Sequence, residues 1–345
     1  MTWTTLRLAI LLSALVPALS LVQTAPATAQ ARPPVRDRAA ADRLRAQGNR
    51  PGNPAGPTEV ETRVLALRDS DTLVVINALG RVSVTGGGSE LRVEITRRLR
   101  APRGGQARQG PAPELEVIEQ DGRVELRTVG TRDGPVAAMD LVIVAPAGAS
   151  TEIRTVGGSI DVRGMTGRLG IETVGGRVTT VGTPGLESVR SVSGDVDVAD
   201  ARTSGHLRVG TVGGDIFLRD LESQGLDVTT IGGSLRAVNL RTGRADVRTV
   251  SGAIAIDGRL SPGGRYVFVS HSGDVRLEVE GDTGFDMDAT SFSGAILANG
   301  AAVGEPAGPR GRRGGAGRQV RTRVGDGSAF VRVQSFSGEI SVGRR

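Results

Sequence analysis

The fold is decided by a motif that returns about every twenty residues, first as TVGGSIDVR (Thr155–Arg163), TVGGRVTTV (Thr173–Val181), SVSGDVDVA (Ser191–Ala199) and TVGGDIFLR (Thr211–Arg219). Further copies continue to SFSGEISVG at Ser335–Gly343. Each copy contains one glycine that aligns all of them, here called the anchor glycine. The nine anchors are Gly158, Gly176, Gly194, Gly214, Gly233, Gly252, Gly273, Gly294 and Gly338. A fixed period of this length is typical of a repeat architecture, in which each repeat stacks on its neighbours.

Aliphatic side chains stand at fixed distances from every anchor. The position two residues after it holds Ile160, Val178, Val196, Ile216, Leu235, Ile254, Val275, Ile296 or Ile340. A second apolar column lies five residues before the anchor, from Ile153 to Val333, and a third lies four residues after it. Residues two apart share one face of a strand, so the pattern predicts an inward-facing strand on either side of each glycine.

The anchor glycine is expected to form a corner between these two strands. Glycine can adopt positive φ in a sharp turn, and it lets successive backbones approach closely. A threonine or serine precedes each anchor by three residues, and these hydroxyls are expected to stack as a ladder between coils. The sequence therefore predicts an all-β, parallel β-solenoid over 149–345, with nine coils spanning roughly 40 Å at about 4.8 Å per coil.

The segment 58–148 carries a weaker version of the same pattern. Val82 and Val84 follow Gly80 by two and four residues, and Val124 and Leu126 follow Gly122 in the same way. Terminal repeats are usually atypical. We therefore expect either irregular first coils or an irregular N-terminal β cap here.

The N-terminus has the pattern of a secretory signal peptide. The stretch from Leu6 to Val22 is apolar apart from Arg7 near its start, and Ala27-Thr28-Ala29 provides a small-residue cleavage site. We expect residues 1–29 to be removed on export to the periplasm, the cell surface or the medium. No later apolar run is long enough to span a bilayer, so no transmembrane segment is expected in the mature chain.

Two residue types are missing from the whole chain, and their absence excludes several kinds of chemistry. There is no cysteine, which rules out disulfides, thiolate nucleophiles and zinc–cysteine sites. There is also no lysine, which rules out the phosphate-binding lysine of a P-loop and Schiff-base catalysis. No cofactor is expected.

The net charge of +6 is concentrated in low-complexity segments. Residues 31–57, 101–113 and 301–323 hold +4, +2 and +5, and Arg7 adds one, so the rest of the chain carries −6. These segments are rich in Pro, Gly, Ala and Arg, with no hydrophobic period. We therefore expect disorder in a linker at 30–57, an insertion at 101–113 and an Arg/Gly loop at 301–320.

The combination of a signal peptide, NALGRVSVTG (Asn77–Gly86), MDLVIVAPAGASTEIRTVGGSIDVRG (Met139–Gly164) and serial TVGG and SxSG coils resembles the putative-adhesin β-solenoid family of bacterial envelope proteins. The resemblance covers roughly Glu59 to the C-terminus. It implies a right-handed β-helix-like fold at the cell surface or in the periplasm, and it brings no catalytic residues.

Few residues are candidates for catalysis or metal binding. His271 aligns with the apolar position two before each anchor, so it is interpreted as a core or corner substitution and not as a triad member with Ser270, Ser272 or Asp274. Asp195 and Asp215 follow their anchors in consecutive coils and form a weak candidate cation or ligand site. Arg177, one coil earlier, can neutralise Asp195 instead.

Taken together, these features favour a non-enzymatic exported protein that acts as an adhesin or as a structural or binding component of the envelope. The alternative is a polysaccharide lyase or hydrolase, which requires clustered carboxylates in a cleft. The partner is expected to be an anionic envelope polymer, a glycan or a protein. No nucleic-acid partner is expected, although PRGRRGGAGR (Pro309–Arg318) is similar to RGG-type tails.

Overall fold

The computed structural model describes residues 58–99, 114–130, 136–299, 301–302 and 318–345. These residues form 26 strands and contain no helix, in one compact unit. The expected signal peptide, the linker 30–57, the insertion 101–113 and residues 303–317 of the Arg/Gly loop lie outside the described residues. At the two ends of that loop the chain forms strands, β23 (Ala301–Ala302) and β24 (Arg318–Val324).

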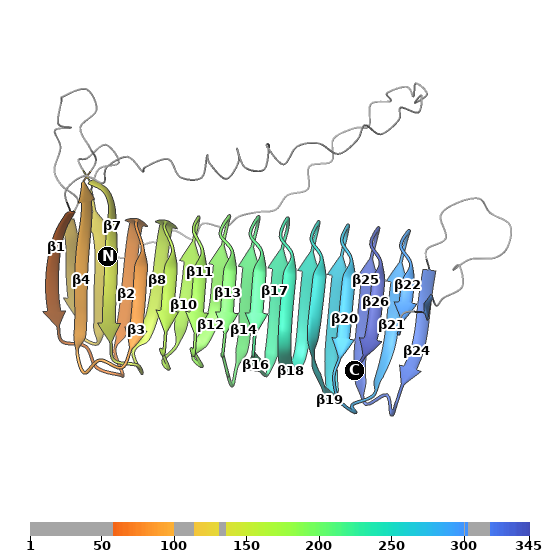
Figure 1. The fold of residues 1–345 in the computed structure, drawn as a ribbon. Coiled ribbons are helices and arrows are strands. Elements are labelled where there is room, and N and C mark those ends of the chain that lie inside the picture. Colours follow the sequence, from red (N-terminus) through yellow and green to blue (C-terminus); the bar gives the residue numbers. More distant parts are fainter. Residues whose placement is uncertain (1–57, 100–113, 131–135, 300, 303–317) are drawn as a thin grey trace, which may run out of the picture. The chain divides into compact units, whose positions relative to one another are not determined.

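Two ladders of strands face each other across the core (Figure 1). The first ladder consists of the strands that precede the corners, in stacking order β5 (Glu114–Gln120), β6 (Arg123–Val129), β2 (Thr72–Leu79), β8 (Ser150–Gly157), β10 (Leu169–Thr173), β12 (Leu186–Ser191), β14 (His206–Thr211), β17 (Gly225–Thr230), β18 (Leu235–Thr249), β19 (Ile254–Ser270), β25 (Ala329–Ser335), β21 (Phe285–Ser291) and β24.

The second ladder consists of the strands that follow the corners, in stacking order β1 (Thr58–Leu65), β4 (Leu91–Leu99), β7 (Val136–Ala145), β3 (Val82–Gly86), β9 (Ile160–Arg163), β11 (Val178–Val181), β13 (Val196–Ala199), β15 (Ile216–Arg219), β18, β19, β20 (Val275–Val279), β26 (Ile340–Arg344), β22 (Ile296–Ala298) and β23. The long strands β18 and β19 run through both ladders. The short β16 (Glu222–Ser223) pairs with β18 at a second corner.

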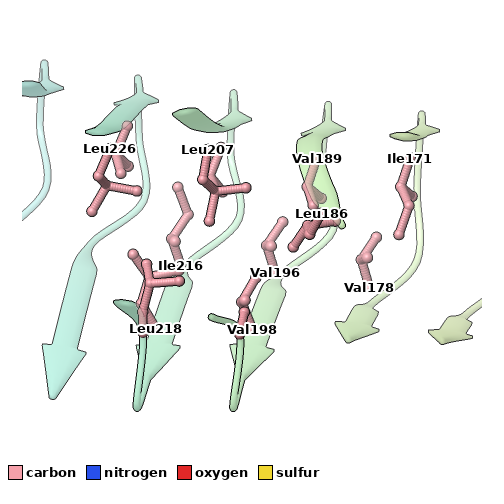
Figure 2. Packing of buried hydrophobic residues seen from close by; sticks show 14 of the residues in the cluster. Ile171, Val178, Leu186, Val189, Val196, Val198, Leu207, Ile216, Leu218 and Leu226 are labelled. Atoms are coloured by element: carbon pink, nitrogen blue, oxygen red, sulfur yellow. The ribbon is translucent and has the colours of Figure 1, made fainter. Parts of the chain in front are cut away.

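The predicted inward columns are confirmed. All nine aliphatic residues that follow the anchors by two positions are buried, from Ile160 to Ile340, and so are those five positions before the anchors. Figure 2 shows Val189 and Leu207 of the first ladder pointing towards Val196 and Ile216 of the second. Each coil thus contributes side chains from both ladders to one continuous apolar core.

The anchor glycines are needed because successive backbones touch at this corner. A Cβ built on Gly214 would lie 2.2 Å from the carbonyl oxygen of Gly194, and one on Gly233 would lie 1.8 Å from that of Gly214. Positive φ, the other reason expected for these glycines, holds only at Gly158 and Gly176 and is wrong for the remaining seven. Close stacking is therefore the common requirement.

The hydroxyl side chains three residues before the anchors also stabilise this corner. The Thr and Ser side chains three residues before the anchors are buried. The expected hydroxyl-to-hydroxyl contact occurs between Thr155 and Thr173 (2.8 Å). At later coils the hydroxyl accepts from the anchor N–H of its own coil, as Ser191 does from Gly194 (2.8 Å). Between coils it donates to an anchor carbonyl, as Ser270 does to Gly252 (3.4 Å), so the ladder connects hydroxyls to backbone oxygens.

The stacking order departs from the chain order at both ends. At the C-terminal end, β25 and β26 lie between the coil of Gly273 and the coil of Gly294, which precedes them in sequence. At the N-terminal end, β2 and β3 lie between β6–β7 and β8–β9. The colours in Figure 1 show both insertions, with orange β2 beside yellow-green β8 and dark blue β25 and β26 beside light blue β20.

Antiparallel strands close the stack beyond these inserted coils. β1 and β4 follow β7, β5 follows β6, and β24 follows β21. On β1 the charged Glu61 and Arg63 stand opposite the buried Ile95 and Val93. Arg63 also donates to the carbonyl of Leu115 on β5 (3.0 Å), which joins the two ladders at this end. Inward-facing charges of this kind oppose edge-to-edge association.

A glycine-to-alanine pair tests the corner. We expect Gly214→Ala to destabilise the fold by about 1–3 kcal/mol or more, because the new methyl overlaps a backbone oxygen of the preceding coil. At the neighbouring Gly213 a Cβ would meet its nearest atom at 3.8 Å, so Gly213→Ala should stay within about 0.5 kcal/mol of wild type. Urea unfolding of both variants checks this, and equal midpoints would contradict it.

Truncation tests the inserted coil. A variant that ends at Ser328 lacks β25 and β26, which are the parallel partners of β21 and β22. We expect hydrogen-exchange protection of Phe285–Ser291 to fall close to the unfolded level, whereas a control ending at Gly343 keeps it. Full protection of β21 in the shorter variant would mean that β21 stacks in chain order.

Acid should weaken the N-terminal closure. Bonds from Arg63 and Arg97 hold the pKa of Glu61 below its ordinary value of 4.5. The lowered pKa stabilises the folded state at pH values above the ordinary pKa. This stabilisation is lost as the pH falls through the folded-state pKa. We therefore expect Glu61→Gln to lower Tm at pH 7 but to differ little from wild type at pH 3. An equal difference at both pH values would contradict this account.

Candidate functional site

The structure gives Asp195 and Asp215 structural partners. Arg177 donates to Oδ2 of Asp195 (2.9 Å), and the backbone N–H of Asp215 donates to Oδ1 of Asp195 (3.1 Å). Oδ1 of Asp215 in turn accepts from the N–H of Ser234 on the next coil (2.8 Å). Within the described residues no group of three or more His, Asp or Glu side chains is arranged to hold a metal ion. The pair therefore links coils through backbone bonds.

His271 and its polar neighbours do not form a catalytic arrangement. Ser270 is buried and donates to the carbonyl of Gly252, and Ser272 donates to that of Val250. Oδ1 of Asp274 accepts from the N–H of Glu339 (2.8 Å). The His271 ring is exposed and stacks on Phe336, with centroids 4.9 Å apart. The histidine thus occupies an exposed corner position, and the part of the interpretation that placed it in the core is wrong.

The other histidine, His206, lies at the start of β14. Its Nδ1 is 3.9 Å from the Asp227 carboxylate, and its ring covers Gly225 of the next coil. This arrangement packs two neighbouring coils together.

A charged groove lies on the outer side of the second ladder, near its C-terminal end. It has a volume of about 370 Å³, and its walls come from β18, β19, β20 and the chain terminus. The residues that line it are Arg236, Ala237, Val238, Ala255, Ile256, Asp257, Arg276, Glu278 and Arg345. A second hollow of about 710 Å³ shares Arg276, Glu278 and Arg345 and continues towards Asp282 and Arg344. We refer to the first hollow as the arginine groove.

The stacking of coils places the charges of the arginine groove. Arg236 and Arg276 flank Ala255 in the register, three residues after their anchors. Asp257 on β19 and Glu278 on β20 are paired in the strand register, and each stands five residues after its anchor glycine. Arg345 reaches the groove because the inserted strand β26 pairs with β20. A purely sequential stack would leave it one coil further away.

Ion pairs neutralise some of the charged side chains in the arginine groove. Arg345 lies 3.2 Å from Asp257 and 3.8 Å from Glu278, and Arg276 lies 3.0 Å from Glu278. Arg236 takes part in none of these three pairs. The second oxygen of Asp257, Oδ1, is buried and accepts no hydrogen bond from any residue that the structure describes. The groove therefore offers the guanidinium group of Arg236, which is exposed and takes part in none of the ion pairs of the groove.

Sequence reasoning missed the arginine groove, because its residues come from four separate segments at outward positions of the strands. The available signal was the position five residues after consecutive anchors, which holds Asp257 and Glu278. Arg345 had no such signal, since the inserted coil determines its place.

Among residues 58–99, 114–130, 136–299, 301–302 and 318–345, no helix could cross a lipid bilayer. The fold and its surface define a β-solenoid of parallel coils with antiparallel end strands. The model of the Toastrack family, DUF4097, matches residues 83–343, and the chain belongs to this family.

The solved structures that match the chain are distant in sequence. A putative adhesin from Parabacteroides merdae is 10% identical, with 84% of this chain and 98% of that chain covered and a TM-score of 0.42. A putative adhesin from Bacteroides fragilis is 13% identical, with coverages of 83% and 97% and a TM-score of 0.40. A putative lipid binding protein from Parabacteroides distasonis is 13% identical, with coverages of 83% and 97% and a TM-score of 0.38. No curated protein matches the chain.

Proposed function

We propose that this chain is an exported, non-enzymatic binding protein of the bacterial envelope, and that its arginine groove holds an acidic polysaccharide. The observation that carries the proposal is that three arginines, Arg236, Arg276 and Arg345, line one groove, and that Arg236 takes part in none of its ion pairs. The same proposal includes the right-handed winding of the coils and residence in the periplasm or at the cell surface.

The groove chemistry favours a ligand with both acidic groups and hydroxyls. A guanidinium binds carboxylate or sulfate groups through paired N–H donors, and Arg236 is exposed and available for this. The carboxylates of Asp257 and Glu278 are partly exposed, and a carboxylate has enough acceptor sites to bind a sugar hydroxyl beside its arginine partner. A polymer also suits an open groove that continues into a second hollow along the stacked strands.

Export is supported by the sequence of residues 1–29, which resembles a cleaved secretory signal. A rigid stack of coils can present such a groove to a polymer without a large ordering cost. Adhesion to envelope or surface glycan is the role that follows from these features.

Alginate, a linear polymer of uronic acids, is a suitable probe, with dextran as the neutral control polymer. We expect the mature chain to bind alginate and not dextran, and Arg236→Ala to weaken alginate binding about tenfold, a change of about 1.4 kcal/mol. Arg208→Ala, which alters an exposed arginine on β14 outside the groove, is the matched control and should bind like wild type. Isothermal titration at constant salt measures all three.

The Arg/Gly loop is the competing location for binding. The triple variant R310S/R312S/R313S removes its central charges and leaves its length unchanged. We expect this variant to retain alginate binding. If it loses binding while Arg236→Ala does not, recognition belongs to the loop and the groove proposal is wrong.

One observation favours the second candidate, a polysaccharide-active enzyme: Asp257 and Glu278 are neighbouring carboxylates in a groove. Glycoside hydrolysis requires two carboxylates in different environments, one acid and one base or nucleophile. Here both carboxylates face the same Arg345 guanidinium. New reducing ends or unsaturated uronates from alginate, abolished by Asp257→Asn, would establish the enzyme instead.

A further inference from the structure

An exposed row of apolar side chains follows the corners, one per coil. Its members stand two residues before each anchor and are 41–55% exposed where they are Val, Ile or Phe. In stacking order they are Val156, Val174, Val192, Val212, Ile231, Val250, His271, Phe336 and Phe292. We call this row the corner ridge. At about 4.8 Å per coil its nine members extend over roughly 38 Å.

The end of the corner ridge is aromatic. The rings of His271, Phe336 and Phe292 stack almost parallel, with centroid separations of 4.9 and 4.7 Å. These three residues are neighbours only because the inserted coil places Phe336 between the other two. Together, nine partly exposed side chains amount to several hundred Å² of apolar surface, at the upper end of what a monomer usually exposes.

The polar groups beside the ridge are already bonded between coils. The carbonyl of Val174 accepts from the N–H of Ser193 (2.9 Å) and also from its hydroxyl (3.1 Å). The carbonyl of Ile231 accepts in the same way from both groups of Ser251, at 2.9 and 3.2 Å. The ridge backbone therefore offers few donors or acceptors to a sugar or a peptide, and its contacts with a partner are mainly apolar.

A track of small residues runs beside the ridge, one position closer to the anchors. Its members are Gly157, Gly175, Ser193, Gly213, Gly232, Ser251, Ser272, Ser337 and Ser293. A Cβ on Gly213 or Gly232 would meet its nearest atom at 3.8 or 3.5 Å, so the track has room above it. The ridge and the track each contain one residue per coil, so both repeat with the same spacing along the stack. A second copy of this surface can thus place its ridge in the track of the first.

We propose that two copies of this chain associate through their corner ridges as a two-fold symmetric dimer. A second copy offers an apolar side chain at each coil with the same spacing, and the surface is self-complementary, as a two-fold interface requires. The ridge and its track approach the roughly 800 Å² per partner of a standard interface.

This dimer does not depend on the proposed polysaccharide function. The arginine groove is lined by residues three to five positions after the anchors and by Arg345, on the outer side of the second ladder, and it shares no residue with the ridge or track. The two proposals can therefore fail separately.

Sedimentation equilibrium of the mature chain tests the dimer. We expect dimers at about 100 μM, and at least about 100-fold weaker association for Ile231→Asp/Val250→Asp, because each carboxylate would be buried unpaired in the interface. The control Val60→Asp/Val64→Asp changes two exposed valines on the end strand β1 and should remain dimeric. Circular dichroism and Tm close to wild type show that each variant is folded.

Cysteine cross-linking provides a second readout, since the chain has no cysteine of its own. Ile231 is the fifth of the nine ridge members, so it meets its own counterpart whether the two stacks run parallel or antiparallel. We expect Ile231→Cys to form an intermolecular disulfide on oxidation and Val142→Cys, an exposed valine on β7, not to do so. A monomeric wild type at about 100 μM, a dimer that survives the ridge substitutions, or monomers that bind phosphatidylcholine vesicles through the ridge would overturn the proposal.

Discussion

Backbone contact between consecutive anchor glycines is the constraint on which the remaining structure depends. A Cβ at most of these glycines would lie about 2 Å from the carbonyl oxygen of the coil before it, as at Gly194 (1.8 Å) and Gly252 (1.9 Å). Because the corners can approach so closely, both ladders keep parallel register and the aliphatic columns fill one core. At every coil the side chain two residues before the anchor lies at the outer surface of this corner, and these side chains form the corner ridge.

The insertion of a coil at each end gives the stack its particular features. Parallel strands at an open end would leave unpaired backbone groups and an exposed core. Here the chain turns back, places β2–β3 or β25–β26 inside the stack, and leaves antiparallel strands outermost. The C-terminal insertion also brings Arg345 into the arginine groove and Phe336 into the aromatic stack. Each of the two candidate interaction surfaces thus receives one residue from the inserted coil.

The sequence predicted the all-β solenoid, its corners and its core columns, because burial repeats with a fixed spacing from each glycine. It could not predict the stacking order, since equivalent motifs at Gly294 and Gly338 are equally able to pair with the coil of Gly273. It also missed a second corner six residues after the anchors, although its signal was present: Gly164, Gly182, Asp200, Asp220 and Asn239 adopt left-handed φ there, a region that Gly and Asx residues favour. The ridge was misjudged because apolar character alone does not distinguish core from exposed corner positions.

The order of coils can be measured most directly by disulfide mapping, with cysteines placed in the small-residue track of the cysteine-free chain. Residues in adjacent coils lie within the Cα separation of about 4.4–6.8 Å that a disulfide requires, and residues two coils apart do not. The account predicts an intramolecular disulfide in Ser272→Cys/Ser337→Cys and none in Ser272→Cys/Ser293→Cys. The reverse result would show that the coils stack in chain order, and it would contradict both the inserted coil and the surfaces built on it.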